Sequence, residues 1–185
     1  MTLAEYLSYD DGTDTRYELI DGELRAVPPE SELNQRIASF LFAVFLKLGI
    51  PFDRINIGSE IVTSGSRATT RIPDLTIFSE ELTAAYRGAS RATITSDMPP
   101  PQLVVEVVSP GLENRDRDYR YKRSEYAARG IAEYWIIDPQ QHKVTILELV
   151  SGLYEERVFV GCEKLLSPSF EQLDLTAEKL LCAEM

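Results

Sequence analysis

The sequence predicts an α/β protein in which a mixed β-sheet is flanked by helices, with one β-hairpin near each end of the chain. Apolar, β-branched runs typical of strands alternate with segments of helical periodicity. Asp21-Gly22 and Ser151-Gly152 each separate two short extended runs, which is a hairpin signal. The sequence contains no repeat, low-complexity tract or long linker, so we expect one domain over residues 1–185.

The first hairpin is expected between Arg16 and Val27, and a helix follows from position 31 or 32 to about Leu48. One helix face carries apolar residues at helical spacing, namely Ile37, Phe40, Leu41, Val44, Phe45 and Leu48. Phe42 and Leu46 add apolar surface on another side. This pattern indicates either a central core helix or a contact between subunits.

The middle of the chain is expected to supply three strands. Arg54–Thr63 is predicted as the first, Ser64–Thr70 as a polar turn, and Ile72–Phe78 as the second strand, broken near its start by a proline. Residues 79–101 contain glycine, serines and three consecutive prolines, which predict a short helix and then a loop. The third strand begins at Leu103 and ends at a Ser-Pro-Gly turn.

A charged amphipathic helix is predicted over Asp116–Arg129, with Tyr119, Tyr126 and Ala127 facing inward. In and beside it lie five arginines: Arg115, Arg117, Arg120, Arg123 and Arg129. They indicate either an ordinary solvated face or a surface that contacts phosphates, and the sequence favours neither.

The last part of the chain is predicted to add three more strands. Glu133–Asp138 is the first, and Lys143–Leu149 and Tyr154–Val160 form the second hairpin. Short helical turns are expected from Leu165 onward.

The chain is acidic, with 19 Lys and Arg against 30 Asp and Glu and a formal net charge of −11. A protein that holds nucleic acid through many phosphate contacts usually has a basic excess. A nucleic-acid function would therefore depend on a local basic patch or on bound cations. The single histidine, His142, lies in a predicted turn, which argues against a Ser-His-Asp triad or a multi-histidine zinc site.

Localisation is indicated by what the sequence lacks. Its first residues contain no apolar segment of the kind found in signal peptides, and the most apolar helical stretch is too short to cross a bilayer. Cys162 and Cys182 are isolated and have no metal-ligand spacing, which is typical of a reducing compartment. We therefore expect a cytoplasmic protein with no membrane partner.

Glu106 stands in the middle of LVVEVVSP, a run expected to be a buried strand. An unpaired carboxylate there is costly, so Glu106 has either a buried partner or a place in a binding site. Asp74 lies in another apolar strand, 32 positions earlier. If the two strands are neighbours, their carboxylates meet, and such a pair needs a proton or a metal ion between them. Mg²⁺ prefers this kind of oxygen site, and Mn²⁺ is the second candidate.

Lys122 lies beside Tyr119 and Tyr126 at the edge of the inward face of its helix, where it can reach the end of the Glu106 strand. A lysine there can orient or deprotonate a water molecule, or stabilise charge on a phosphate.

Each candidate also has a purely structural interpretation. Asp74 follows a proline and can cap a turn. Glu106 can form a buried ion pair with Lys122 or Arg123. Lys122 taken alone is typical of a solvated helix lysine.

Four stretches carry a resemblance to a known family: YELIDGEL (Tyr17–Leu24), RIPDL (Arg71–Leu75), LVVEVVSP (Leu103–Pro110), and Lys122 followed by EYAARGIAEYWIIDP (Glu125–Pro139). In this order they resemble the restriction-endonuclease family first catalogued as a domain of unknown function, within the PD-(D/E)XK phosphodiesterase superfamily. The resemblance covers about Tyr17 to Phe170. It implies a restriction-endonuclease-like fold, Mg²⁺-dependent hydrolysis of phosphodiester bonds in DNA, and a homodimer.

The resemblance also implies roles for individual residues. Asp74 and Glu106 match the acids that bind the metal ion. The superfamily commonly places its lysine two residues after the glutamate, where this sequence has Val108. This family is thought to supply the lysine from the following helix, which gives Lys122.

Two positions in the first part of the chain complete the comparison. An acid there is expected to assist, and Glu23 is the fourth catalytic candidate, ahead of Glu18. Family members commonly carry a histidine near the start of the first long helix, where this chain has Asn34, which cannot shuttle a proton near neutral pH. Two hypotheses follow: a metal-dependent DNA endonuclease, or a catalytically weak or inactive homodimeric interaction module that retains the nuclease fold.

Overall fold

A six-stranded mixed sheet forms the centre of the molecule, with strand order β11-β10-β9-β8-β6-β3. Its strands are β3 (Ile55–Asn56), β6 (Leu75–Ile77), β8 (Leu103–Val107), β9 (Glu133–Asp138), β10 (Lys143–Val150) and β11 (Leu153–Val160). β8 and β9 are parallel, and the other neighbours are antiparallel. The computed structural model describes residues 1–63 and 67–184, without the side chains of Glu113 and Arg115.

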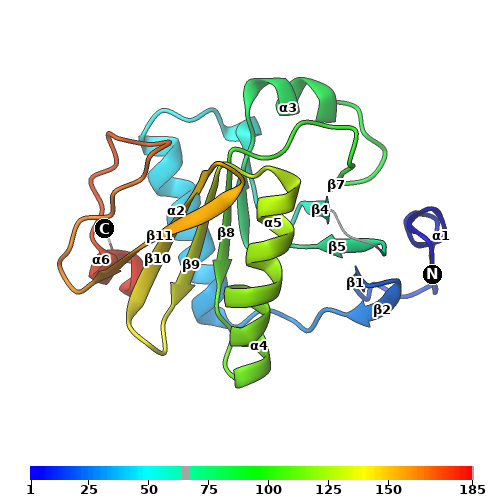
Figure 1. Ribbon diagram of the computed structural model, residues 1–185, viewed down its shortest axis with the longest axis horizontal. Coiled ribbons are helices and arrows are strands. Elements are labelled where there is room, and N and C mark those ends of the chain that lie inside the picture. The colour runs from blue at the N-terminus through cyan, green and yellow to red at the C-terminus, as the bar shows by residue number, and fades with distance from the viewer. Residues whose placement is uncertain (64–66, 185) are drawn as a thin grey trace.

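Helices cover both faces of this sheet (Figure 1). α2 (Glu32–Lys47) lies behind it, with α6 (Ala177–Cys182) packed against α2. In front lies one continuous helical segment made of α4 (Leu112–Asp116), the π-helix η2 (Arg117–Lys122) and α5 (Arg123–Arg129). The predicted architecture, a mixed sheet flanked by helices, is therefore confirmed.

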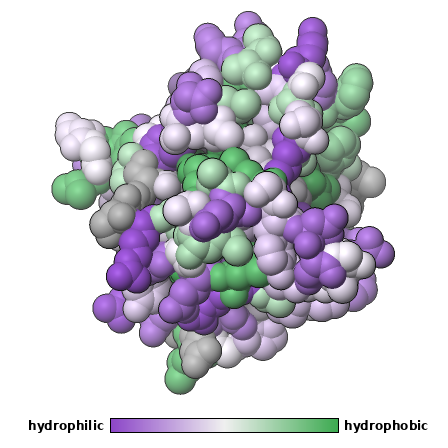
Figure 2. Space-filling view, turned by 90° about the vertical axis from the view of Figure 1, so that its right-hand side faces the viewer, coloured by the Kyte–Doolittle hydropathy of each residue, from purple (hydrophilic) through white to green (hydrophobic). Residues whose placement is uncertain are grey.

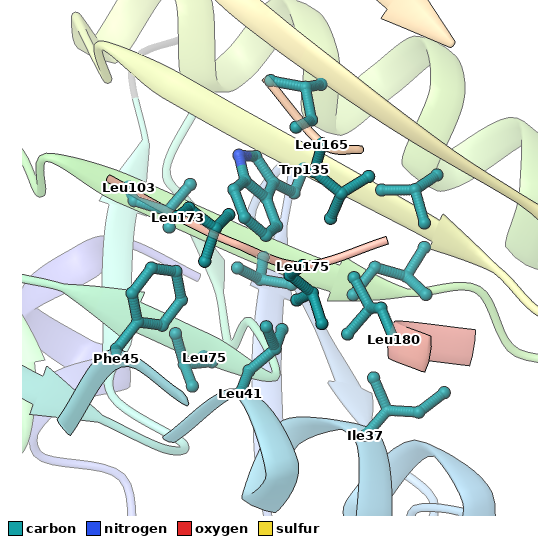
Figure 3. Close-up of a cluster of buried hydrophobic side chains, with 14 of the residues drawn as sticks. Ile37, Leu41, Phe45, Leu75, Leu103, Trp135, Leu165, Leu173, Leu175 and Leu180 are labelled. Atoms are coloured by element: carbon teal, nitrogen blue, oxygen red, sulfur yellow. The ribbon is translucent and has the colours of Figure 1, made fainter. Parts of the chain in front are cut away.

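The main hydrophobic core lies between α2, the sheet and the C-terminal segment (Figure 3). Ile37, Leu41 and Phe45 of α2 are fully buried and face Leu75 and Trp135 of the sheet. The apolar stripe of α2 is thus explained by the core, as one of its two interpretations proposed. On the other side of the helix Leu46 is 46% exposed.

Two smaller sheets lie beside the central one, on the right in Figure 1 together with α1 (Leu3–Leu7). β1 (Tyr17–Ile20) and β2 (Glu23–Ala26) form a hairpin. β4 (Glu60–Thr63) pairs with β5 (Thr69–Arg71) and β7 (Thr93–Ile94). The remaining elements are the 3₁₀ turn η1 (Phe52–Arg54) and α3 (Glu80–Tyr86).

Both predicted hairpins are present, and their turns have the backbone conformation that the sequence predicts. Asp21 and Gly22 have φ of 50° and 80°, and Ser151 and Gly152 have φ of 51° and 84°. Positive φ at both central residues is the property that asparagine, aspartate and glycine tolerate best, and it matches the twist of the flanking strands. The predicted α2 is also confirmed, with Ser31 as its N-cap.

Four predictions of the elements were wrong in part. Arg54–Thr63 is not one strand: Gly58, at a φ of 75°, separates β3 from β4, and the two belong to different sheets. Of the predicted turn Ser64–Thr70, residues 64–66 lie outside the described residues, while Thr69 and Thr70 begin β5.

The other two errors concern later segments. The predicted loop before β8 contains the short strand β7, and the predicted helix over Asp116–Arg129 begins four residues earlier and includes the π-helix. From Leu165 onward α6 is the only helix in the described chain. Within the described ranges, no helix combines the length and apolar character needed to cross a membrane.

Candidate active site

Asp74 and Glu106 meet because β6 and β8 are antiparallel neighbours, with Leu75 paired to Val105. Asp74 precedes β6, and its Oδ2 accepts the backbone N–H of Val107 at 2.6 Å. Both carboxylates line one cleft of about 470 Å³. The condition under which the two acids were expected to meet, that their strands are neighbours, is therefore fulfilled.

Glu106 is buried in the floor of this cleft and has two partners. Its Oε2 lies 2.7 Å from Lys122 Nζ, and its Oε1 accepts the hydroxyl of Tyr126 at 2.6 Å. Lys122 Nζ also forms a second ion pair, at 3.1 Å, with Asp118 Oδ1. The structure therefore contains the buried ion pair that was the structural interpretation of Glu106, and it places this pair beside Asp74 in an open cleft.

The π-helix η2 supplies Lys122 and Asp118 of this ion-pair network. Asp118 and Lys122 are four residues apart on it, and both side chains are buried. The hydroxyl of Tyr134 on β9 donates to the backbone carbonyl of Asp118 at 3.0 Å, which fixes the segment against the sheet. π-helical turns are rare and often occur at functional sites. Asp118 was not among the predicted site residues.

The protonation states differ across the cluster. Burial and the charge of Glu106 raise the pKa of Asp74 well above its usual value, against the opposing effects of the Val107 N–H and Lys122. Burial raises the pKa of Glu106 to about 7, against the opposing effect of Lys122. Burial alone would lower the pKa of Lys122, but Asp118 and Glu106 raise it above its usual value. Lys122 is thus a fixed positive charge and not a base that deprotonates water.

A second ion-pair network forms the wall of the cleft. Arg71 donates from Nε and Nη2 to the two carboxylate oxygens of Glu125, each at 2.7 Å. Its Nη1 lies 3.4 Å from Glu18 Oε2, and Glu18 Oε1 accepts the N–H of Ile72 at 2.9 Å. The network ties the first hairpin to α5 across β5, so it sets the width of the cleft.

Glu18 lines the cleft, but Glu23 does not. Glu23 follows the hairpin turn, is exposed, and lies 3.6 Å from Arg25 in a surface ion pair. The structure therefore does not bring Glu23 together with Asp74, Glu106 and Lys122. Glu30, which no sequence pattern singled out, also lines the cleft and contributes to the raised pKa of Asp74 after burial and Glu106.

Asn34 contacts the residue that follows Glu106. Its Nδ2 lies 3.2 Å from the carbonyl oxygen of Val107 and 3.3 Å from Glu30 Oε2. A carbonyl only accepts hydrogen bonds, so the amide nitrogen must face it. Asp74 and Asn34 thus hold the N–H and the carbonyl of Val107, which fixes the end of β8.

The arginines of the helical segment have separate roles. Arg117 lines the cleft, and its Nε lies 3.4 Å from Asp118. Arg123 pairs with Glu156 on β11, and Arg129 donates to two backbone carbonyls. The side chain of Arg115 lies outside the described part of the chain. Arg120 is exposed and does not line the cleft, so phosphate contact within the cleft remains a proposal for Arg117 among these arginines.

Comparison with protein families places this chain. A family model described as "Putative restriction endonuclease" (Uma2) matches residues 3–178, which is nearly the whole chain. The chain belongs to this family. No curated protein matches it.

The fold of this Uma2 family member is shared with a solved structure. The crystal structure of a "putative nuclease belonging to DUF820 from Anabaena variabilis" covers 99% of this chain and 98% of its own, with a TM-score of 0.73 and 18% sequence identity. The likeness establishes the same mixed α/β fold over the full length.

The residues of this Uma2 protein fit a divalent cation in the types of donor they offer. Asp74 and Glu106 supply carboxylate oxygens, and the Val107 carbonyl has a second lone pair. In the described residues no group of three or more Asp, Glu, His and Cys side chains is arranged to hold a metal ion. Mg²⁺ binds through one or two carboxylates and keeps several of its waters, so this smaller donor set suits it better than Zn²⁺ or Ca²⁺. Burial, followed by the negative charge of Glu106, raises the pKa of Asp74, and a bound cation would offset both effects.

Proposed function

We propose that this protein is a Mg²⁺-dependent endonuclease that hydrolyses phosphodiester bonds in DNA. The observation that carries the proposal is the convergence of Asp74 and Glu106, from two neighbouring strands, in one cleft beside the buried Lys122. The family and its solved neighbour, described as a putative nuclease, support it.

In this proposal Asp74 and Glu106 hold the metal ion, with Mn²⁺ as a substitute for Mg²⁺. A bound divalent cation lowers the pKa of a coordinated water and stabilises charge on a phosphate oxygen. Lys122 keeps its proton, so it orients the attacking water or the phosphate through hydrogen bonds and charge. Asp118 and Tyr126 fix Lys122 and Glu106 in place.

Cationic side chains at the cleft provide the remaining contacts to the substrate. Arg117 and Arg25 both line the cleft, and neither is fully buried. Their guanidinium groups are suited to bind phosphates on either side of the scissile bond. Because the net charge is −11, we expect DNA affinity to depend strongly on these few contacts and on divalent cations.

The test is nicking of supercoiled plasmid by the purified protein with Mg²⁺ or Mn²⁺ and with EDTA. We expect nicking that requires the metal ion and is lost in Glu106→Ala. Glu155→Ala, which removes an exposed acid on β11, is the matched control and should keep full activity. Metal-independent nicking, or equal nicking by Glu106→Ala, would contradict the proposal.

The alternative is a homodimeric interaction module without turnover. The position of Asn34, which offers no proton near neutral pH, is the observation that favours it. This alternative predicts a dimer in analytical ultracentrifugation and no nicking with either metal ion. The endonuclease proposal also includes a homodimer, so only the nicking assay separates the two.

A further inference from the structure

A second pocket lies on the side of the molecule that carries α1 and the two small sheets. Its volume is about 280 Å³, and we call it the tyrosine–arginine pocket after Tyr6, Tyr9, Tyr17, Arg16 and Arg91, which line it. Figure 2 faces this side, where hydrophilic residues predominate and small hydrophobic patches lie among them. Neither the sequence motifs nor the proposed active site accounts for this pocket.

The pocket adjoins the proposed active-site cleft. Ile72 lines both, and Tyr17 in the pocket is followed on β1 by Glu18 in the cleft. A DNA strand bound in the cleft would therefore pass the mouth of the pocket within a short distance of the scissile bond.

Hydrogen bonds fix the rings of Tyr6 and Tyr17, and the ring of Tyr9 packs against Tyr17. The Tyr17 hydroxyl donates to Asp11 Oδ2 at 2.6 Å, and the Tyr17 and Tyr9 rings pack edge to face with centroids 5.7 Å apart. The Tyr6 hydroxyl bonds to the Tyr17 carbonyl and to Glu60. Tyr9 remains 38% exposed, so a ring face stays available to a planar ligand.

The two arginines of the pocket differ in their partners. Arg91 is neutralised by Glu60, at 3.3 Å, and lies over the Tyr6 ring. Arg16 donates to the Gly58 carbonyl at 2.9 Å and has no ion-pair partner among the described residues. A Cβ at position 58 would lie 3.0 Å from the Arg16 guanidinium, so glycine there lets Arg16 lie against the backbone. Arg16 is thus a positioned, uncompensated cation in an acidic protein.

We propose that the tyrosine–arginine pocket binds one nucleotide of a single DNA strand, with its base against Tyr9 and its phosphate at Arg16; the choice of DNA rests on the proposed function. Aromatic side chains on which bases stack, with a neighbouring arginine, are the means by which proteins bind single strands without reading sequence. Asp10, Asp11 and Asp14 follow Tyr9 in the sequence and oppose phosphates near the pocket, and a duplex would bring two phosphate rows to them where a single strand brings one. The pocket therefore selects a strand that is single or locally unpaired next to the cleft.

The test is fluorescence anisotropy of a labelled single-stranded oligonucleotide of about five nucleotides, the scale of small single-strand sites. It uses the full chain in EDTA, so that no cleavage takes place. Tyr9→Ala should weaken binding roughly 10-fold. Arg16→Ala should reduce the slope of log K against log salt by about 0.7, the value for one phosphate contact on a single strand.

Matched controls are Phe52→Ala and Arg87→Ala, which remove an exposed aromatic ring and an exposed arginine away from the pocket. They should bind like the unmodified chain. Competition by dAMP but not by the same concentration of inorganic phosphate is expected. The proposal is overturned if both pocket variants bind like the controls, or if phosphate competes as well as dAMP.

This experiment separates the pocket from the active site. If Glu106→Ala abolishes nicking while the pocket variants bind normally, the pocket proposal fails and the endonuclease proposal stands. If the unmodified chain shows no nicking but its oligonucleotide binding depends on Tyr9 and Arg16, the pocket proposal stands without the endonuclease.

Discussion

Glu106 on β8 and Glu133 on β9 are carboxylates on neighbouring parallel strands, and their exposed fractions are 3% and 0%. Glu133 accepts hydrogen bonds from Trp135 Nε1 at 2.5 Å, Ser167 Oγ at 2.7 Å and the Ser169 N–H at 3.0 Å. All three donors are neutral, and two of them belong to the C-terminal segment. Glu133 therefore fastens that segment to the start of the interior strand β9.

Glu106 is satisfied in a different way, through the charge of Lys122 and the hydroxyl of Tyr126. It also lies in an open cleft beside Asp74. The negative charge of Glu106 disfavours the charged form of Asp74 and so raises its pKa. An acid within an apolar strand is thus no sign of a binding site by itself, because Glu133 meets the same description. The second acid, the buried cation and the cleft distinguish Glu106.

The largest expected difference between the two glutamates is in catalysis. Glu106→Ala should lower the rate of plasmid nicking by about 10³-fold, since it removes one of the two carboxylates proposed to bind the metal ion, and a metal ion supplies several kcal/mol to such a reaction. Glu133→Gln should leave the rate per folded molecule unchanged. Nicking rates with Mg²⁺, normalised to the folded fraction by circular dichroism, check both. Equal losses in the two variants would remove the distinction.

The next difference concerns the cation. Lys122→Met leaves Glu106 buried without its cation, so at pH 8 we expect it to lower the free energy of unfolding by about 3–5 kcal/mol. Urea titrations at several pH values measure this. Since the pKa of Glu106 is raised to about 7 even with Lys122 present, Glu106 takes up a proton as the pH falls below that value. The cost of the substitution should therefore be smaller at pH 5. A cost that does not change with pH would contradict this account of the pair.

A smaller effect is expected at the structural glutamate. Glu133→Gln replaces one of the two acceptor oxygens by an NH₂ group, which accepts no hydrogen bond. The remaining oxygen cannot accept from Trp135, Ser167 and the Ser169 N–H together. We expect a loss of about 1–3 kcal/mol in the free energy of unfolding. Faster amide hydrogen exchange at Ser169, with Val107 unchanged, would localise the effect. Exchange that increases equally at both amides would indicate a shared network instead.

The smallest expected effect is a gain in stability from Asp74→Asn. The pKa of Asp74 is raised in the folded protein above the ordinary value of 3.8, so the folded chain loses stability as the pH rises from that value through the folded pKa. Asparagine carries no charge at any of these pH values, so the variant does not lose this stability, and its side chain still accepts the Val107 N–H. At pH 8 its melting temperature should exceed that of the unmodified chain by about 2–4 °C, the shift that about 1 kcal/mol gives at this size. The difference should vanish near pH 4, and an Asp74→Asn variant less stable at pH 8 would show that Asp74 is compensated in the free protein.

The features of the fold that the sequence predicted are those with local causes. The Asp21-Gly22 and Ser151-Gly152 turns require positive φ, and α2 begins at a serine cap and has a continuous apolar stripe. β3 and β7 have two residues each, too short to show alternation, and their pairing depends on distant parts of the chain. Hydrophobic patterning therefore could not separate β3 from β4.

The residues of the candidate site likewise divide into those with a local sequence signal and those placed by distant contacts. Asp74, Glu106 and Lys122 were found because two acids interrupt apolar runs and the motif order resembled a known family. The prediction from the sequence ranked Glu23 ahead of Glu18, whereas Glu18 is the one that lines the cleft. The choice depends on how the hairpin packs on β5, where the Leu19 N–H donates to Thr70. The contact of Asn34 with the Val107 carbonyl links residues 73 positions apart, and no local pattern encodes it.

The most direct test of the central claim, that Asp74 and Glu106 share a divalent cation, is calorimetric titration of the protein with Mn²⁺. We expect the unmodified chain and Glu133→Gln to bind one ion per chain with the same affinity, and Asp74→Ala to lose binding at that site. If the unmodified chain binds no Mn²⁺, or if Asp74→Ala binds it equally well, then the acids of the cleft are structural in the same sense as Glu133.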